Sequence, residues 1–156
     1  KRNTKVMGIS VDGVAEHKKW KGDIETFAGA KATFPIIADT DLAVAKAFDM
    51  LPADAYLPDG RTANDTATVR SVFIVAPNKK VQLIMTYPMS VGRNFAEVLR
   101  ALDAVQASFG VPVAMPANWV PGQDVIVALS LTDDQAREKF GEIDIKLPYL
   151  RTTKLK

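Results

Sequence analysis

One arginine occupies the junction between a predicted strand and a predicted helix, within residues 87–95. This is Arg93, and Asn94 directly after it is a residue type that often begins helices. A helix start presents free backbone N–H groups and positive partial charge, and a guanidinium beside it adds donors in a planar fork. The junction is therefore suited to bind an anion or to stabilise developing negative charge. The same pattern alone is also typical of an ordinary surface or capping arginine.

The second informative feature is that the chain contains no cysteine and a single histidine, His17. Without thiols it has no disulfide and no thiolate metal site, and one histidine disfavours a zinc centre of the usual kind. We expect no metal or organic cofactor. The absence bears on Arg93, because a cation beside a thiol lowers the pKa of that thiol and activates it. The arginine makes most chemical sense next to a cysteine that these residues lack.

Composition narrows the range of functions. The 156 residues are 47% hydrophobic and 24% charged, as in an ordinary globular domain with an appendage. The net charge of +2 gives no strong field that would favour nucleic acid or an anionic membrane. No apolar run reaches the roughly 20 residues of a spanning helix. Because Lys1 leads almost directly into a predicted buried strand, we expect an N-terminal portion that is missing from this sequence.

The first part of the chain alternates predicted strands and helices. Three- and four-residue steps between Trp20, Ile24 and Phe27 predict a helix that Gly29 ends. Asp41 is the expected cap of a second, short helix. We expect strands at residues 6–11 and 34–39, helices at 14–27 and 42–48, and a loop at 51–66.

Two β-rich runs follow, at residues 69–75 and 81–87, and their short polar connection predicts an antiparallel hairpin. Asn94 then begins a helix, and Glu97 three residues later resembles a capping box. Alternating strands and helices followed by a hairpin and a helix indicate an α/β sandwich, the later part of a thioredoxin-like fold.

Residues 111–156 differ in composition from the rest and hold few core positions. A strand is expected at residues 125–129, a capping box at 132–135, and a basic, solvated tail at 147–156. So few residues form a weak core alone, so we interpret this part as an arm that packs on its own subunit or on a partner. Trp119 is its expected anchor.

Several short segments occur in a characteristic order and spacing. They are Ile9-Ser10-Val11-Asp12, His17 with Trp20, Phe34-Pro35-Ile36-Ile37-Ala38-Asp39, Arg70-Ser71-Val72-Phe73-Ile74-Val75, Pro77-Asn78-Lys79-Lys80, Tyr87-Pro88, Gly92-Arg93-Asn94-Phe95, Val113-Ala114-Met115-Pro116-Ala117-Asn118-Trp119 and Tyr149-Leu150-Arg151-Thr152. Together they resemble a one-cysteine peroxiredoxin of the peroxiredoxin-6 type, from residue 1 to about residue 152.

The resemblance implies a thioredoxin-like core over residues 1–110, incomplete at its N-terminus, and a C-terminal dimerisation arm over residues 111–156. It implies a cytoplasmic homodimer that reduces hydrogen peroxide and organic hydroperoxides. A cysteine thiolate becomes a sulfenic acid in this reaction, and an external thiol reductant recycles it. The pocket arginine of the family falls on Arg93. The proline, threonine and cysteine of that pocket lie upstream of Lys1 and are not carried over.

Other residues have plainer interpretations. Arg70 either pairs with an acid across the sheet, which we favour, or lies near the pocket. His17 is interpreted as a packing residue with one hydrogen bond, and Trp20 as a pocket wall or core residue. The cysteine-free chain alone is expected to be inactive. The alternative function is a non-catalytic thioredoxin-like scaffold, whereas the near-balanced charge disfavours nucleic-acid binding.

Overall fold

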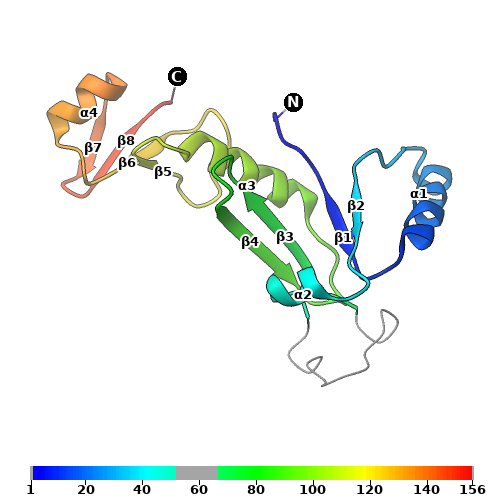
Figure 1. Ribbon diagram of the computed structural model, residues 1–156. Coiled ribbons are helices and arrows are strands. Elements are labelled where there is room, and N and C mark those ends of the chain that lie inside the picture. The colour runs from blue at the N-terminus through cyan, green and yellow to red at the C-terminus, as the bar shows by residue number, and fades with distance from the viewer. Residues whose placement is uncertain (1, 52–66, 156) are drawn as a thin grey trace. The chain divides into compact units, whose positions relative to one another are not determined.

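The computed structural model describes residues 2–51 and 67–155, and within them the chain forms four α-helices and eight β-strands (Figure 1). These elements belong to two compact units. The first consists of residues 1–72 and 84–93, and the second of residues 73–83 and 94–156. The predicted loop at 51–66 lies, apart from its first residue, outside the described residues.

The first unit contains a parallel strand pair. Strand β1 (Gly8–Ser10) pairs residue by residue with β2 (Ile36–Ala38), and helix α1 (Val14–Ala28) lies between them in sequence (Figure 1). The predicted strands and helix are thus confirmed. Strand β1 is shorter than predicted, because Val6 and Met7 are 62% and 64% exposed and precede the paired residues.

Helix α1 ends as predicted but buries a different side chain. Gly29 follows it with φ of 63°, and its N–H donates to the Glu25 carbonyl at 3.0 Å. Trp20 is 46% exposed and Phe27 91% exposed, whereas His17 is the buried residue of this helix. The interpretation of Trp20 as a core residue is therefore not supported among the described residues, and its other interpretation, a pocket wall, stays a prediction.

Helix α2 (Ala43–Ala47) begins on an aspartate other than the expected one. The carboxylate of Asp39, only 3% exposed, accepts the backbone N–H groups of Val44 at 2.9 Å and Ala45 at 2.7 Å. Asp41 accepts only the N–H of the first helical residue, at 3.3 Å. Asp39 is thus the main cap, because the chain turns back after β2 and brings this carboxylate under the helix start.

The predicted hairpin is confirmed. Strands β3 (Arg70–Val75) and β4 (Val81–Tyr87) form a two-stranded sheet and run in opposite directions (Figure 1). The N–H of Ala76 donates to the Lys80 carbonyl at 3.0 Å and closes the connection. Lys79 adopts a left-handed conformation there, with φ of 64°, which tightens the turn.

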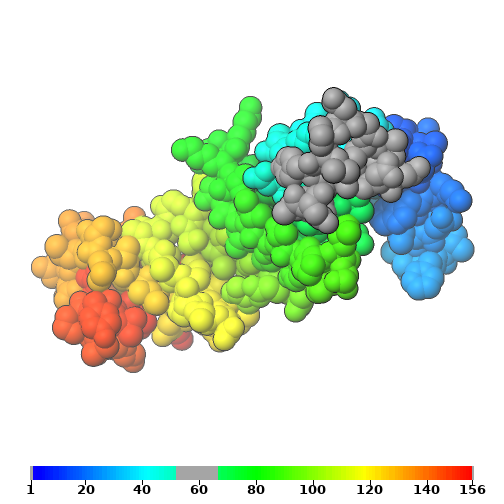
Figure 2. All heavy atoms as spheres, turned by 90° about the horizontal axis from the view of Figure 1, so that it is seen from below, coloured from blue at the N-terminus to red at the C-terminus, as the bar shows by residue number. Residues whose placement is uncertain are grey.

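The second unit combines a long helix with a small antiparallel sheet. Its helices are α3 (Phe95–Ser108) and α4 (Asp133–Phe140), and its other strands are β5 (Val113–Ala114), β6 (Val125–Val127), β7 (Asp144–Leu147) and β8 (Leu150–Thr153). The sheet order is β5-β6-β8-β7. Figure 2 shows α4 in orange next to the red C-terminal strands.

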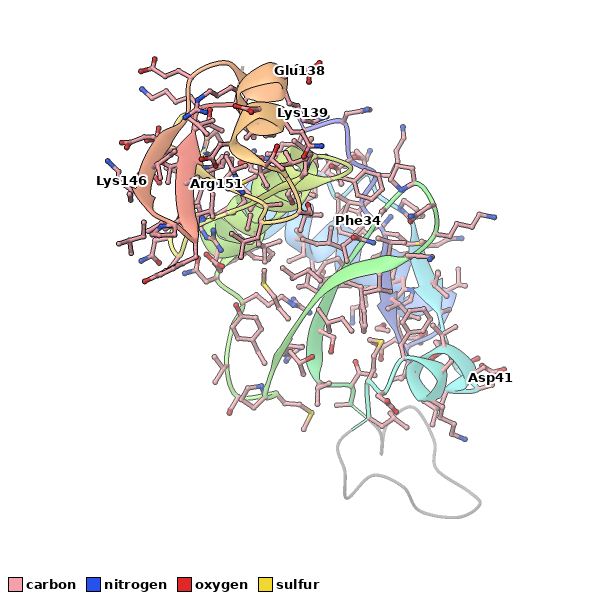
Figure 3. All side chains as sticks on the ribbon, turned by 90° about the vertical axis from the view of Figure 1, so that its left-hand side faces the viewer. Phe34, Asp41, Glu138, Lys139, Lys146 and Arg151 are labelled. Atoms are coloured by element: carbon pink, nitrogen blue, oxygen red, sulfur yellow. The ribbon has the colours of Figure 1, made fainter. Side chains whose placement is uncertain are left out.

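The predicted solvated tail at residues 147–156 is wrong for Leu150–Thr153, which form strand β8. Arg151, which Figure 3 labels, lies on this strand. Its exposed fraction is only 4%. Its Nη1 donates to the Asp133 carboxylate at 2.8 Å and its Nη2 donates to the Ala128 carbonyl at 2.9 Å. The guanidinium therefore joins β8 to the start of α4 and to the end of β6. The hydrogen-bond partners of Arg151 are too distant in sequence for a local residue pattern to predict them.

This unit has a small core of its own. Val125, Val127 and Ala136 are fully buried, and Trp119 is 3% exposed. The capping box predicted at residues 132–135 is present in both halves and begins α4. These apolar side chains are accompanied by the buried guanidinium of Arg151 and its half-exposed partner Asp133, a combination that composition did not indicate.

Substituting Asp133→Asn should lower the free energy of unfolding of this unit by about 1–3 kcal/mol, because it leaves a buried guanidinium without its counter-charge. The matched control is Asp134→Asn. Asp134 is also in the first turn of α4, but its side chain is 99% exposed and its pair with Arg137 spans 3.5 Å. Urea unfolding is followed by Trp119 fluorescence in a Trp20→Phe background. Equal stability losses in the two variants would contradict the prediction.

Candidate active site

Arg93 lies on the connection between β4 and α3. Strand β4 ends at Tyr87, and the N–H of Val91 donates to the Pro88 carbonyl at 3.0 Å in the turn that follows. This confirms that Tyr87 and Pro88 end the strand. Arg93 is exposed, and within the described part of the chain its guanidinium forms no hydrogen bond or ion pair.

Helix α3 begins at the residue after the predicted cap. The side chain of Asn94 accepts the backbone N–H of Glu97 at 3.2 Å, which confirms Asn94 as the cap. The first N–H groups of a helix have no acceptor within it and carry the positive end of its dipole. In the sequence, Arg93 directly precedes the cap residue of this helix.

The other half of the predicted capping box is absent, because the Glu97 side chain binds elsewhere. Arg100 donates to it twice, from Nε to Oε2 at 2.6 Å and from Nη2 to Oε1 at 2.8 Å. The remaining Nη1 of Arg100 donates to the Trp119 carbonyl at 3.1 Å. The indole of Trp119 donates in turn to the Gln123 carbonyl at 3.1 Å. A charged bidentate pair prevails over a single bond to a neutral amide.

The ion pair also changes the titration of both groups. The hydrogen bond from Arg100 lowers the pKa of Glu97 below its ordinary value of 4.5, and the same contact raises the pKa of Arg100. Because the pKa of Glu97 is lower in the folded chain than its ordinary value, the ionised carboxylate stabilises the fold at pH values above the ordinary pKa. This stabilisation is lost as the pH falls through the lowered pKa. Near neutral pH the pair is therefore fully charged. Sequence reasoning missed it, although an acid and a base three residues apart were its signal.

Arg70, the second arginine considered from the sequence, is exposed at the start of β3. It forms no ion pair across the sheet with any residue that the structure describes, so the favoured interpretation is not supported there. Arg70 and Arg93 belong to the same compact unit. Its other interpretation, a place near the pocket, stays a prediction.

His17 lies in a small polar cluster at the end of β1. Its Nε2 is 2.7 Å from the Ser10 hydroxyl, and that hydroxyl donates to the Asp12 carboxylate at 2.9 Å. His17 is 8% exposed, and its Nδ1 is buried without a partner among the described residues. Serine therefore lies between the histidine and the acid, whereas a serine-hydrolase relay needs the histidine in the middle. The predicted packing role with one hydrogen bond is confirmed.

Two other site types are absent from residues 2–51 and 67–155. In these ranges no three or more His, Asp or Glu side chains are placed to hold a metal ion. None of the helices there is both long and apolar enough to cross a membrane.

Comparison with known proteins shows the family of this chain. The AhpC/TSA family model matches residues 1–84, and a model of the C-terminal domain of 1-Cys peroxiredoxin matches residues 104–142. The mitochondrial peroxiredoxin PRX1 of Saccharomyces cerevisiae is 46% identical over 159 residues, and the 1-Cys peroxiredoxin PER1 of Triticum aestivum is 40% identical over 162. The chain belongs to the one-cysteine peroxiredoxin family. It spans 59% of the yeast relative and 72% of the wheat one.

Solved structures give the same result for the fold. A cysteine-to-serine mutant of peroxiredoxin 6 from Arenicola marina superimposes with a TM-score of 0.87 at 36% identity, over 99% of this chain and 72% of that one. The yeast mitochondrial 1-Cys peroxiredoxin gives 0.83 at 43% identity, over 98% and 71%. The α/β thioredoxin-like fold class and the family resemblance are thereby confirmed.

Proposed function

We propose that this chain is part of a thiol peroxidase and supplies Arg93 as the cation of its peroxide pocket. The observation that carries the proposal is the exposed guanidinium, which has no partner among the described residues and directly precedes the start of α3. Membership of a family named for one cysteine supports it. Because the chain has no cysteine, the proposed thiolate comes from a segment outside this sequence.

The proposed reaction is an oxygen transfer to sulfur. The thiolate attacks one oxygen of hydrogen peroxide or an organic hydroperoxide, a sulfur–oxygen bond forms, and the oxygen–oxygen bond breaks. The second oxygen leaves with its electron pair, takes up a proton, and departs as water or an alcohol. The sulfur ends as a sulfenic acid, two electrons more oxidised. An external thiol then reduces it, and in the yeast mitochondrial relative thiol resolution proceeds via the glutathione and thioredoxin systems.

Arg93 would stabilise negative charge on both the cysteine sulfur and the peroxide. A guanidinium near the cysteine favours the thiolate over the thiol, and the thiolate is the nucleophilic form. It also donates hydrogen bonds to the peroxide oxygens as negative charge develops on the leaving one. Arginine suits this role because it stays charged at any physiological pH.

The remaining proposals concern organisation. We propose a peroxiredoxin core over residues 1–110 and an arm over residues 111–156, and the two separate family models support a two-part chain. We propose a homodimer, supported by large apolar side chains exposed on the second unit, among them Leu129 at 67% and Tyr149 at 66%. A cytoplasmic location remains a prediction, and the yeast relative PRX1 is a mitochondrial protein.

A non-catalytic scaffold is the second candidate, and the absence of cysteine is the observation that favours it. The encoding gene discriminates between the two. A cysteine-containing segment encoded upstream of Lys1 favours the peroxidase, whereas a start codon at Lys1 favours the scaffold.

The cysteine-free chain should show no peroxidase activity. Neither a carboxylate nor an amine matches the reactivity of sulfur toward the oxygen–oxygen bond. Hydrogen peroxide consumption is measured with excess dithiothreitol, with the boiled chain as background. Turnover above that background would show that the reaction proceeds without the proposed thiolate.

In the full-length protein, Arg93→Ala should lower the second-order rate constant for hydrogen peroxide by about 10²–10³-fold, the usual loss for one donor to developing charge. Arg93→Lys should retain part of the rate, because it keeps the charge and loses the planar fork. Arg137→Ala is the matched control, since that arginine lies on α4 with only an exposed acid as partner. A normal rate in Arg93→Ala would refute the proposed function.

Light scattering of the full-length protein at micromolar concentration tests the homodimer. We expect a mass twice that of the monomer, because exposed apolar surface is covered on association. Monomer alone at this concentration would exclude the dimer and leave the peroxidase proposal intact.

A further inference from the structure

Residues 116–123 of the arm form a closed turn, the Trp119 turn. The N–H of Trp119 donates to the Pro116 carbonyl at 3.1 Å, and its indole Nε1 donates to the Gln123 carbonyl, also at 3.1 Å. The side-chain oxygen of Gln123 accepts the N–H of Val120 at 3.1 Å, and the N–H of Gln123 donates to the Val120 carbonyl at 3.2 Å. Trp119 is 3% exposed, and strand β6 begins soon after the turn. The turn is therefore a well-bonded entry to the sheet of the arm.

One charged side chain of α3 reaches this turn. Nη1 of Arg100 donates to the Trp119 carbonyl at 3.1 Å. Glu97 holds the rest of the same guanidinium, since Nε and Nη2 donate to its two carboxylate oxygens at 2.6 and 2.8 Å. All three residues belong to the second compact unit. The planar fork thus joins a carboxylate on α3 to a backbone carbonyl of the turn.

The carboxylate determines how well the guanidinium can hold the turn. An unrestrained arginine loses side-chain entropy when it forms a single bond to a carbonyl. Here the bidentate bond to Glu97 already fixes the direction of the fork, so the bond to Trp119 requires little further ordering. The side chains of Arg100 and Glu97 are 27% and 41% exposed, so water can reach both. Without the charge of Glu97, water would compete for the donors of Arg100.

We propose that Arg100 is a clasp that fixes the Trp119 turn to α3, and that the negative charge of Glu97 keeps this clasp closed. Glu97 acts on the turn through Arg100, which makes it a positioning residue. The clasp holds this part of the arm on its own chain, one of the two possibilities that the sequence left open. It requires neither a cysteine nor Arg93, so it stands apart from the proposed peroxidase function.

Arg100→Lys separates the clasp from a simple ion pair. Lysine keeps the positive charge three residues after Glu97 but lacks the planar fork that serves the carboxylate and the Trp119 carbonyl together. Hydrogen exchange of the Trp119 indole N–H is measured by NMR on the 156-residue chain in a Trp20→Phe background. We expect exchange about tenfold faster in Arg100→Lys and in Glu97→Gln, because the turn opens more often once a charge-assisted hydrogen bond is lost.

Asp134→Asn is the matched control, because Asp134 also pairs with an arginine three residues later, at 3.5 Å, and belongs to the same unit. Its indole exchange should equal that of the unchanged chain. Unchanged exchange in Arg100→Lys would overturn the clasp, and unchanged exchange in Glu97→Gln would overturn its control by charge. Equal acceleration in Asp134→Asn, or at the Leu102 amide inside α3, would assign the effect to a general loss of stability and overturn the proposal as well.

Discussion

The bidentate ion pair between Glu97 and Arg100 restrains the first turns of α3, the helix that follows Arg93 in the sequence. It takes up the carboxylate that would otherwise complete a capping box, so the side chain of Asn94 caps the helix without a reciprocal bond from Glu97. The remaining donor of Arg100 bonds to the Trp119 carbonyl, so the same guanidinium joins α3 to the segment that precedes β6.

A second ion pair, between Arg151 and Asp133, joins the C-terminal sheet to the start of α4. Arg151 is buried and its partner Asp133 is half exposed, so the pair costs desolvation at one end only. The pair adds stability that so short a segment cannot gain from buried apolar area alone. Residues 111–156 therefore contain buried apolar side chains of their own, whereas their composition had indicated a weak core.

The features that could be predicted from the sequence are those whose partners lie close along the chain. Asn94 with Glu97, Thr132 with Gln135 and the turn that joins β3 to β4 all involve residues within about one helical turn of each other in sequence. A strand or cap of this kind is determined by local backbone geometry, so the pattern of residue types shows it. The family resemblance then gave the fold class that no single segment specified.

What could not be predicted depends on distant partners or on competition between near ones. Arg151 was interpreted as solvated because its acceptors are 18 and 23 residues away. Asp39 reaches its helix start only because the chain turns back after β2. Glu97 had two local options, and choosing between them requires a comparison of bond strengths. The apolar spacing of α1 identified a face of the helix but not what covers it.

The distribution of cationic groups supports the division of labour proposed for this chain. His17, the single imidazole, is buried and already engaged by Ser10. Arg151 and Arg100 are committed to Asp133 and Glu97. Arg93, like Arg70, is exposed and without such a partner among the described residues, and a guanidinium needs no proton exchange to keep its charge. A thiolate brought to this arginine would meet a fixed cation rather than one that must first be released from an internal ion pair.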